Sequence, residues 1–427
     1  MTRLFRNGTI FYNGEFQERD FLIDDDGIII IADTIDIGDA VDEEIDCAGL
    51  HIMPGFIDTH VHLRSPGFEY KETMESGTMA AAHGGVTSVF AMPNLKPAPD
   101  TLEHLEEEWK LIEHEAKVHV YPIAAITKEQ KADSEVNDIA ALSESTFLFS
   151  DDGVGVQDEE TMRAAMKACA KVDGVIIAHC EDESELKAGG CVHEGEVDKR
   201  LGLVGINSAS EYKQVMRDLK LAEETGCQYH ICHMSTKESV EALRQAKAKG
   251  VNASGEVTVH HLLLNENDIT ENHGRFKMNP PLRSKEDQEA LIEGIKDGTI
   301  EVICTDQAPH SEEEKNTTMD KAKMGIVSIE VSFPLVYTRL VKEKIITLEQ
   351  AIALMSTNAA KIFGIEGGYI HNLEKANLTI YNLKAPNRVD SRKFLSKGKS
   401  TPFDGWRLSG KCLMTIVDGE IVYREDL

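Results

Sequence analysis

Hydrophobic segments that end in polar residues recur through the middle of the chain. Each has the length and the apolar content of a buried β-strand. The segments are FIDTHVHL (56–63), VTSVFAM (86–92), VHVYPIAAI (118–126), FLFSDD (147–152), VIIAHC (175–180), QYHICH (228–233), VNASGEV (251–257) and IEVICTD (300–306). Stretches with the spacing of amphipathic helices lie between them, for example at residues 101–116, 160–172 and 238–250. The pattern predicts eight β-strands that alternate with α-helices.

Eight strand–helix units predict an α/β fold, the (β/α)8 barrel of the TIM type, whose active site lies at the C-terminal ends of the strands. A doubly wound open sheet is the alternative, but that architecture has no need of eight units. One further amphipathic helix is predicted over residues 346–364, with Thr347 and Gln350 at capping-box spacing and Gly364 as its stop. We therefore expect the barrel to occupy residues 55–364.

The two ends of the chain share a different pattern. Residues 1–54 contain short apolar runs, with an Asn-Gly hairpin signal at Asn13-Gly14. Residues 377–383 and 412–423 return to this pattern, and the second stretch contains an Asp-Gly turn. We expect residues 1–54 and 365–427 to form one composite β domain, a small β-sandwich beside the barrel.

Composition and charge narrow the functional classes. The 427 residues are 41% hydrophobic and 28% charged, as in ordinary soluble globular proteins. The net charge of −29 argues against nucleic acid and anionic membranes as partners, and an anionic substrate would need a local positive centre. The eight cysteines are scattered without a CxxC pair, which indicates reduced thiols. Because the N-terminal segment is too charged for a signal peptide and the apolar runs are too short to span a membrane, we expect a soluble, cytoplasmic protein.

Histidines and aspartates collect at the ends of the predicted strands. They are His60 and His62 on strand one, Asp151 and Asp152 on strand four, His179 on strand five, His233 on strand six and Asp306 on strand eight. Side chains alternate along a strand, so His60 and His62 share one face, as does Arg64 if the strand extends that far. His230, within the sixth strand, is expected to be structural.

Imidazole and carboxylate ligands suit Zn²⁺ and related divalent cations. Four imidazoles and two carboxylate positions exceed the needs of one tetrahedral ion, so two ions that share a carboxylate are the favoured arrangement. Such a pair lowers the pKa of a bound water and polarises a carbonyl group. A carboxylate on strand eight is then placed to relay the proton to a leaving group.

Seven motifs occur together in the chain. They are HVHLR (60–64), MPN (92–94), SDDG (150–153), AHCED (178–182), CHMST (232–236), KMNPPLRS (277–284) and TDQAPH (305–310). This combination resembles dihydroorotase of the short bacterial class, within the amidohydrolase superfamily. The resemblance extends over nearly the whole chain, including both terminal β segments.

The resemblance implies roles for individual residues. The implied metal ligands are His60, His62, Asp152, His179, His233 and Asp306, with Asp152 as the bridge and Asp306 also as the catalytic acid and base. The implied substrate-binding residues are His62, Arg64, Asn94, Asn279, His310, Met324 and Gly325. Arg64 and Asn94 would hold the substrate carboxylate with help from His310, whereas Asp151 would point away. The implied cofactor is Zn²⁺, one or two per subunit.

The resemblance also implies a reaction and partners. The reaction is the reversible hydrolysis of (S)-dihydroorotate to N-carbamoyl-L-aspartate in de novo pyrimidine (UMP) biosynthesis. In it a metal-bound hydroxide attacks the ring amide and Asp306 relays the proton. The implied partners are a second copy of the chain, as a homodimer, and aspartate carbamoyltransferase.

The chain departs from the family pattern at three places. Leu95 replaces a threonine, Gln307 replaces a histidine, and KMG (323–325) replaces Pro-Phe-Gly. Catalysis is expected to survive the change at Gln307, because that side chain should point away from Asp306.

Two other functions are weighed against this one. Hydantoinase (dihydropyrimidinase) and allantoinase bridge their metals through a carboxylated lysine on strand four, where this chain has SDDG, and Lys128 is expected to be a solvated loop residue. An inactive, dihydroorotase-like scaffold for aspartate carbamoyltransferase would lack metal ligands, whereas this chain has a candidate at each position.

Overall fold

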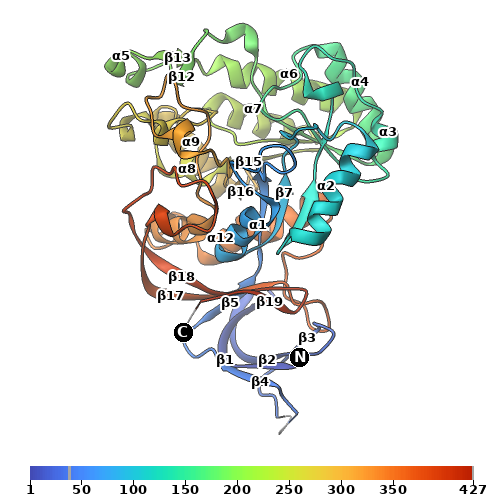
Figure 1. Ribbon diagram of the computed structural model, residues 1–427, viewed down its shortest axis with the longest axis vertical. Coiled ribbons are helices and arrows are strands. Elements are labelled where there is room, and N and C mark those ends of the chain that lie inside the picture. Colours follow the sequence, from blue (N-terminus) through green and yellow to red (C-terminus); the bar gives the residue numbers. More distant parts are fainter. Residues whose placement is uncertain (37–39, 426–427) are drawn as a thin grey trace.

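The computed structural model of the chain describes residues 1–36 and 40–425. The fold is mixed α/β and of the TIM-barrel type, with helices packed around central strands and a β region below them (Figure 1). Each of the eight predicted strand segments contains a strand, and the third contains two short ones. These strands are β6 (Phe56–Val61), β7 (Val86–Ala91), β8 (His119–Pro122), β9 (Ala124–Ala125), β10 (Leu148–Ser150), β11 (Val175–Ala178), β14 (Gln228–Ile231), β15 (Ala253–Thr258) and β16 (Val302–Cys304).

Parallel pairing follows the order of the chain. One sheet has the order β6-β7-β8 and a second has the order β9-β10-β11-β14-β15-β16. The segment after β16 returns to the first strand, because the His62 N–H donates to the Gln307 carbonyl at 2.8 Å and Val61 forms a parallel bridge with Gln307. The last strand end therefore lies beside the first, which brings residues 60–62 and 306 together.

Helices connect the strands and cover them. Their bounds are α1 (Met74–His83), α2 (Leu102–Glu115), α3 (Ile139–Leu142), α4 (Glu159–Cys169), α5 (Val197–Leu201), α6 (Ala209–Thr225), α7 (Lys237–Ala248), α8 (Val259–Leu263), α9 (Lys285–Asp297), α10 (Glu312–Lys315), α11 (Ser332–Val336), α12 (Leu348–Ile352) and α13 (Asn358–Phe363). The helices predicted at 101–116, 160–172 and 238–250 are confirmed as α2, α4 and α7.

The helix predicted over residues 346–364 contains a local irregularity. Its capping box at Thr347 and Gln350 is present, and it ends at Gly364 with φ of 64°. Between α12 and α13, residues 353–357 form a π-helical turn, so the segment is one interrupted helix rather than a uniform one. The amphipathic pattern predicts the helix but is too coarse to indicate one widened turn.

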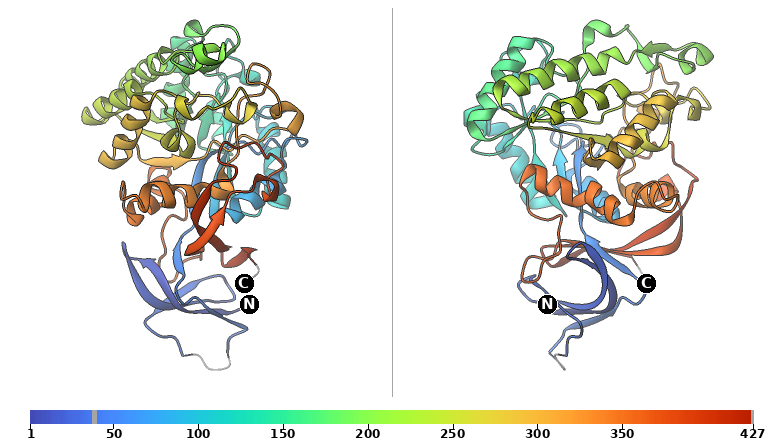
Figure 2. Two further views of the ribbon diagram at one scale, coloured as in Figure 1. Left: turned by 90° about the vertical axis from the view of Figure 1, so that its left-hand side faces the viewer. Right: turned by 180° about the vertical axis from the view of Figure 1, so that it is seen from behind.

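Strands from both ends of the chain form a single eight-stranded sheet (Figure 2). Its strands are β1 (Arg3–Tyr12), β2 (Glu15–Ile23), β3 (Ile29–Ala32), β4 (Glu43–Asp46), β5 (His51–Pro54), β17 (Leu378–Arg388), β18 (Arg407–Val417) and β19 (Glu420–Arg424). The hairpin signals at Asn13-Gly14 and Asp418-Gly419 are confirmed, and all four residues have positive φ. The antiparallel pair β5 and β17 joins the two ends.

Two further features complete the fold. The pair β12 (Gly190–His193) and β13 (Val204–Ile206) was not predicted, because runs of three or four residues give little periodic signal. All eight cysteines are buried free thiols, in agreement with the scattered cysteine pattern. Among the described residues, no helix is both long and apolar enough to span a membrane.

Helix α2 contains an acidic side chain in the core. Glu108 is 1% exposed, and neither carboxyl oxygen has a hydrogen-bond partner among the described residues. Burial alone raises the pKa of Glu108 well above its ordinary value. The folded protein therefore keeps this proton over a pH range in which the unfolded chain releases it.

Replacement of Glu108 by leucine is expected to stabilise the fold by about 1 to 3 kcal/mol near neutral pH, because a buried polar group without partners is removed. Wild-type stability falls as pH rises above the ordinary glutamate pKa, so the gain should increase from about pH 5 to about pH 8. Denaturant unfolding of both proteins at the two pH values measures this. The control is Glu107→Leu, at an exposed position on the same helix. An equal effect of both changes, or a gain independent of pH, would contradict the prediction.

Candidate metal centre and active site

The six predicted metal-ligand positions lie at one end of the central strands. His60 lies on β6 and His62 follows that strand directly, while the remaining four follow the ends of β10, β11, β14 and β16. All six side chains are buried: His60, His62, Asp152, His179, His233 and Asp306. The C-terminal ends of parallel strands meet at one face of this type of fold, which is why positions far apart in the sequence converge there.

Asp152 lies at the centre of the cluster. Its Oδ1 atom is 3.4 Å from His60 Nε2 and 3.6 Å from both His179 Nδ1 and His233 Nε2. Its Oδ2 atom is 3.6 Å from His62 Nε2. Asp306 lies on one side of this centre, with Oδ1 at 3.1 Å from His62 Nε2 and 3.6 Å from His60 Nε2.

The donor atoms fit divalent cations. Two ligands held about 2.0 to 2.1 Å from a tetrahedral ion are about 3.3 Å apart, which matches the separations around Asp152 and Asp306. Two of these atoms, His60 Nε2 and Asp152 Oδ1, are buried and have no hydrogen-bond partner among the described residues. Buried polar atoms normally have hydrogen-bond partners, so a metal ion bound between these two atoms would account for their lack of partners. The cluster is therefore a candidate metal centre.

Both carboxylates of the cluster are ionised. Burial would raise the pKa of Asp306, but the hydrogen bond from His62 and the positive charge of His60 lower it to about 2. Burial also opposes ionisation of Asp152, yet His60 and His233 hold its pKa well below the ordinary value. Ionised oxygens at these positions are suited to bind a cation or to accept a proton.

Three residues of the site adopt a backbone conformation that is rare outside glycine. The φ angles are 61° at Arg64, 28° at His233 and 48° at Asp306. Such conformations cost free energy and occur preferentially at functional sites. Strand alternation does not explain the position of Arg64, because β6 ends at Val61 and does not extend that far. The Arg64 side chain reaches the site from a turn instead.

A cavity of about 300 Å³ opens beside the metal-ligand cluster. All seven predicted substrate-binding residues line it: His62, Arg64, Asn94, Asn279, His310, Met324 and Gly325. Arg64 Nε donates to the Pro309 carbonyl at 3.3 Å, and Asn94 Nδ2 donates to the Asp152 carbonyl at 2.6 Å. The structure thus brings a guanidinium and amide groups into the same space as the ionised carboxylates.

The side chains of Asp151, Gln307 and Lys128 lie as expected from the sequence, with partners outside the metal-ligand cluster. Asp151 accepts hydrogen bonds from the backbone of Ile126 and Thr127 and points away from the cluster. The Gln307 amide oxygen accepts from the backbone N–H groups of residues 328 and 329, away from Asp306. Lys128 is exposed and pairs with Glu135.

Sequence reasoning missed Glu256 on β15. Its Oε1 atom is 2.9 Å from His60 Nδ1, and its Oε2 atom is 3.3 Å from His230 Nε2. A carboxylate that accepts from Nδ1 leaves Nε2 of His60 free to face the centre, and so fixes the orientation of this ring. The one signal in the sequence is a lone acidic residue inside the buried segment VNASGEV.

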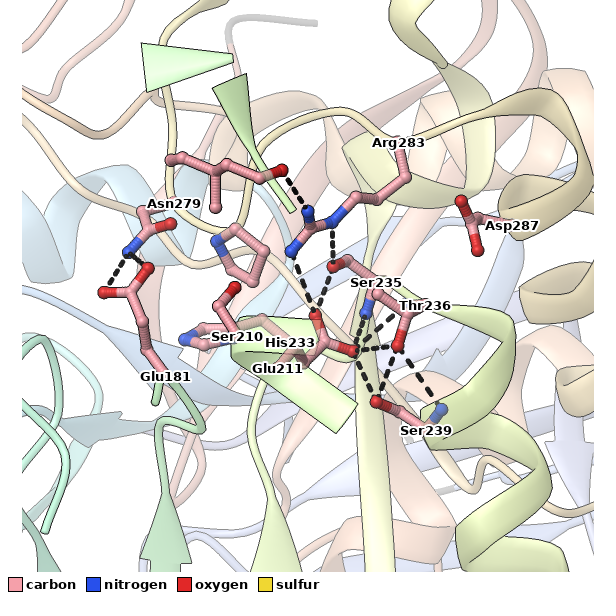
Figure 3. A network of polar contacts seen from close by, with 12 residues as sticks. Glu181, Ser210, Glu211, His233, Ser235, Thr236, Ser239, Asn279, Arg283 and Asp287 are labelled. Atoms are coloured by element: carbon pink, nitrogen blue, oxygen red, sulfur yellow. Dashed lines mark hydrogen bonds and ion pairs between the residues drawn. The ribbon is translucent and has the colours of Figure 1, made fainter. Parts of the chain in front are cut away.

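A buried network lies behind His233 (Figure 3). Glu211, on α6, accepts hydrogen bonds from the backbone N–H groups of Ser235 and Thr236, both at 3.0 Å. The Arg283 guanidinium donates from Nε to Ser235 Oγ at 3.0 Å, and its Nη2 lies 3.9 Å from Glu211. Asn279, four residues before Arg283, donates to Glu181. Through Arg283 and Ser235, the network connects the segment that follows the candidate ligand His233 with the segment that follows Asn279, a residue of the cavity lining.

Comparison with solved structures defines the class of the fold. The L-hydantoinase (dihydropyrimidinase) of Arthrobacter aurescens superposes with a TM-score of 0.88 at 24% identity, over 100% of this chain and 96% of that one. The dihydropyrimidinase of Brevibacillus agri gives 0.85 at 22%, over 99% and 95%. At these identities the likeness concerns the fold. Together with the dihydroorotase relatives described next, this fold indicates a cyclic amidohydrolase enzyme.

Sequence comparison identifies the family within this class. The Dihydro-orotase-like family model matches residues 49–239. The dihydroorotase of Bacillus cytotoxicus is 49% identical over 428 residues, covering 100% of this chain and 99% of that protein. The Staphylococcus aureus dihydroorotase is 48% identical over 424 residues, covering 99% and 100%. The chain belongs to the dihydroorotase family.

Proposed function

We propose that this enzyme catalyses the reversible hydrolysis of (S)-dihydroorotate to N-carbamoyl-L-aspartate in de novo pyrimidine biosynthesis. The observation that carries the proposal is that Arg64 and the candidate metal centre share one cavity. Dihydroorotate has a carboxylate close to a ring amide, so its enzyme must provide a cationic contact and a hydrolytic centre side by side. The curated relatives named dihydroorotase support this substrate.

Arg64 and Asn94 hold the substrate carboxylate in this proposal, and His310 helps from beside Arg64, whose Nη2 lies 3.4 Å from His310 Nε2. A guanidinium presents paired N–H donors that match the two oxygens of a carboxylate. Arg64 also supplies local positive charge in a chain whose net charge is −29. His62, Asn279 and the Met324-Gly325 segment contact the rest of the substrate.

The candidate ligand cluster, with Asp152 at its centre, would hold two Zn²⁺ ions. When bound, such ions supply an activated water and polarise the amide carbonyl. Asp306, whose Oδ1 lies 3.1 Å from His62 Nε2, would accept a proton on its carboxylate during hydrolysis and deliver it to the ring nitrogen as the C–N bond breaks. In ring closure the same carboxylate takes the proton from the carbamoyl nitrogen.

The domain organisation that we propose follows the sequence expectation. Residues 55–364 form a closed (β/α)8 barrel, supported by the bridge between Val61 and Gln307. Residues 1–54 and 365–427 form a composite β domain with the character of a small sandwich. Hydrogen bonds of Ile29 with Leu373 and Glu374 support the packing of the two chain ends against each other.

The family resemblance further supports a cytoplasmic homodimer and an association with aspartate carbamoyltransferase. Sedimentation of the purified protein, alone and together with aspartate carbamoyltransferase, would test both.

The alternative substrates are the uncharged rings of the hydantoinase and allantoinase type. Two observations disfavour them. The residues after β10 are Asp151 and Asp152, with no lysine to be carboxylated, and the cavity contains Arg64, which an uncharged ring does not need. An inactive scaffold is disfavoured because all six candidate ligands are present and buried together.

The test is turnover by the purified protein reconstituted with Zn²⁺. Loss and formation of the dihydroorotate ring are followed by absorbance in both directions, with hydantoin and allantoin as comparison substrates. We expect activity with dihydroorotate, loss of activity on chelation and recovery with Zn²⁺. Absence of turnover by a protein with bound metal, or faster hydrolysis of hydantoin, would disprove the assignment.

A further inference from the structure

The turn after β6 places a lysine beside His310 at the edge of the cavity. Lys71 Nζ lies 3.2 Å from His310 Nδ1 and 3.1 Å from Glu314 Oε1. The rings of Phe68 and Tyr70 lie against the same ammonium group, with centroids at 5.6 Å and 5.5 Å. The Lys71 side chain is 11% exposed, so its head group is held in one place.

Hydrogen-bond chemistry then assigns the tautomer of His310. Its Nε2 atom is 2.6 Å from the Met324 carbonyl oxygen, which can only accept, so Nε2 carries the hydrogen. The Nδ1 atom of the neutral ring is consequently an acceptor, and the Lys71 ammonium is the donor facing it. Burial and the positive charges of Arg64 and Lys71 lower the pKa of His310 to about 3, which keeps the ring neutral.

Glu314 favours the opposite tautomer. Its Oε2 atom is also 3.2 Å from His310 Nδ1 and would accept a hydrogen from that position. In that state Nε2 would have a lone pair, and it lies 3.4 Å from Arg64 Nη2. The guanidinium would then donate to the imidazole, and the bond to the Met324 carbonyl would be lost. The two tautomers therefore differ in what Arg64 and the loop at residue 324 can do.

We infer that Lys71 is a positioning residue that holds His310 in the Nε2–H tautomer. In this state Arg64 Nη2 is free for the substrate carboxylate, and Met324 is anchored at the edge of the cavity. Gly325, next to Met324, donates to the Lys277 carbonyl at 3.0 Å, so the anchored loop is held from both sides. The inference rests on the proposed role of Arg64 in binding dihydroorotate.

The test compares the zinc-loaded wild type with Lys71→Met, with Lys71→Arg as the conservative variant. Lys96→Met is the matched control, since Lys96 is exposed and its backbone donates to Pro66 on the same turn. Nitrogen NMR of isotope-labelled histidine, assigned by comparison with His310→Asn, reports the tautomer. Steady-state kinetics with dihydroorotate gives KM and kcat separately.

In Lys71→Met we expect the protonated nitrogen of His310 to change from Nε2 to Nδ1. We also expect KM to rise about tenfold with kcat changed less than about twofold, because carboxylate binding is equal in ground and transition states. Lys71→Arg should keep the Nε2–H tautomer of His310 and a KM close to that of the wild type. Lys96→Met should leave the tautomer and KM unchanged.

An unchanged tautomer in Lys71→Met would overturn the inference, even if KM rose, because Lys71 would then act by charge alone. A changed tautomer with unchanged KM would also overturn it, since Arg64 would not depend on His310. If the wild type failed to turn over dihydroorotate at all, the proposed function would be wrong, while the NMR comparison would still measure the effect of Lys71 on His310.

Discussion

Replacement of Asp306 by asparagine is expected to lower kcat by about 10²- to 10⁴-fold, the usual contribution of a positioned acid or base. The asparagine amide has nearly the size of the carboxylate but cannot accept a proton. Because the pKa of Asp306 is about 2, the wild-type side chain is the acceptor form throughout the neutral range. The substitution therefore removes the proton relay at every pH of interest.

Asparagine is the suitable substitution for a backbone reason as well. Asp306 has φ of 48°, a conformation that asparagine tolerates and alanine does not. Loss of activity in Asp306→Asn therefore does not follow from backbone rearrangement. The measurements are kcat per bound metal ion, with metal content determined by mass spectrometry, and the midpoint of thermal unfolding. Near-normal kcat at normal metal content would show that the relay lies elsewhere.

The positions of the metal-ligand candidates could be predicted because they depend on the fold alone. Counting eight strand segments is sufficient to bring residues such as His60, His179 and Asp306 to one face, since parallel strands in this architecture end together. The terminal sheet could be predicted in outline for a similar reason, because the turn signals at Asn13-Gly14 and Asp418-Gly419 act locally. The strand ends follow from a periodic pattern, and the hairpin turns follow from a dipeptide, so both can be recognised in the sequence.

The groups that orient these ligands could not be predicted in the same way. The contact of Glu256 with His60 joins residues 196 positions apart, and that of Lys71 with His310 joins residues 239 apart. Neither follows from strand alternation or helical spacing. Arg64 reaches the cavity through a left-handed turn, which the pattern of HVHLR does not indicate. Local patterns thus locate the chemistry, whereas tertiary contacts decide how each side chain is held.

The second prediction concerns the stability of the fold and the buried network of Glu211, Ser235 and Arg283 beside His233. Arg283 is 3% exposed, and its Nη1 atom also donates to the carbonyl groups of Ile206 and Asn207 at 2.9 Å and 3.2 Å. Burial would raise the pKa of Glu211, but the charge of Arg283 and the hydrogen bonds of Ser235 hold it below its ordinary value. Glu211 is therefore a buried anion whose cationic partner is Arg283 (Figure 3).

Arg283→Met is expected to destabilise the fold by about 3 to 5 kcal/mol, because it leaves the Glu211 carboxylate buried without a cation. In the wild type, a lowered pKa of Glu211 gives stability that is present above the ordinary glutamate pKa and lost as pH falls. In Arg283→Met the pKa of Glu211 should rise, so the deficit should be larger at about pH 8 than at about pH 5. Denaturant unfolding at both pH values measures this.

A double-mutant cycle with Glu211→Gln separates the ion pair from the rest of the network. The double variant should be more stable than the sum of the two single effects predicts, because the uncompensated charge is absent. Arg244→Met is the control: Arg244 pairs with Asp297 at 39% exposure, and its loss should cost less than about 1 kcal/mol. Additive effects in the cycle would show that Arg283 acts through Ser235 and the carbonyl groups of residues 206 and 207. A non-additive cycle would show that Arg283 stabilises the fold mainly by compensating the buried Glu211 carboxylate.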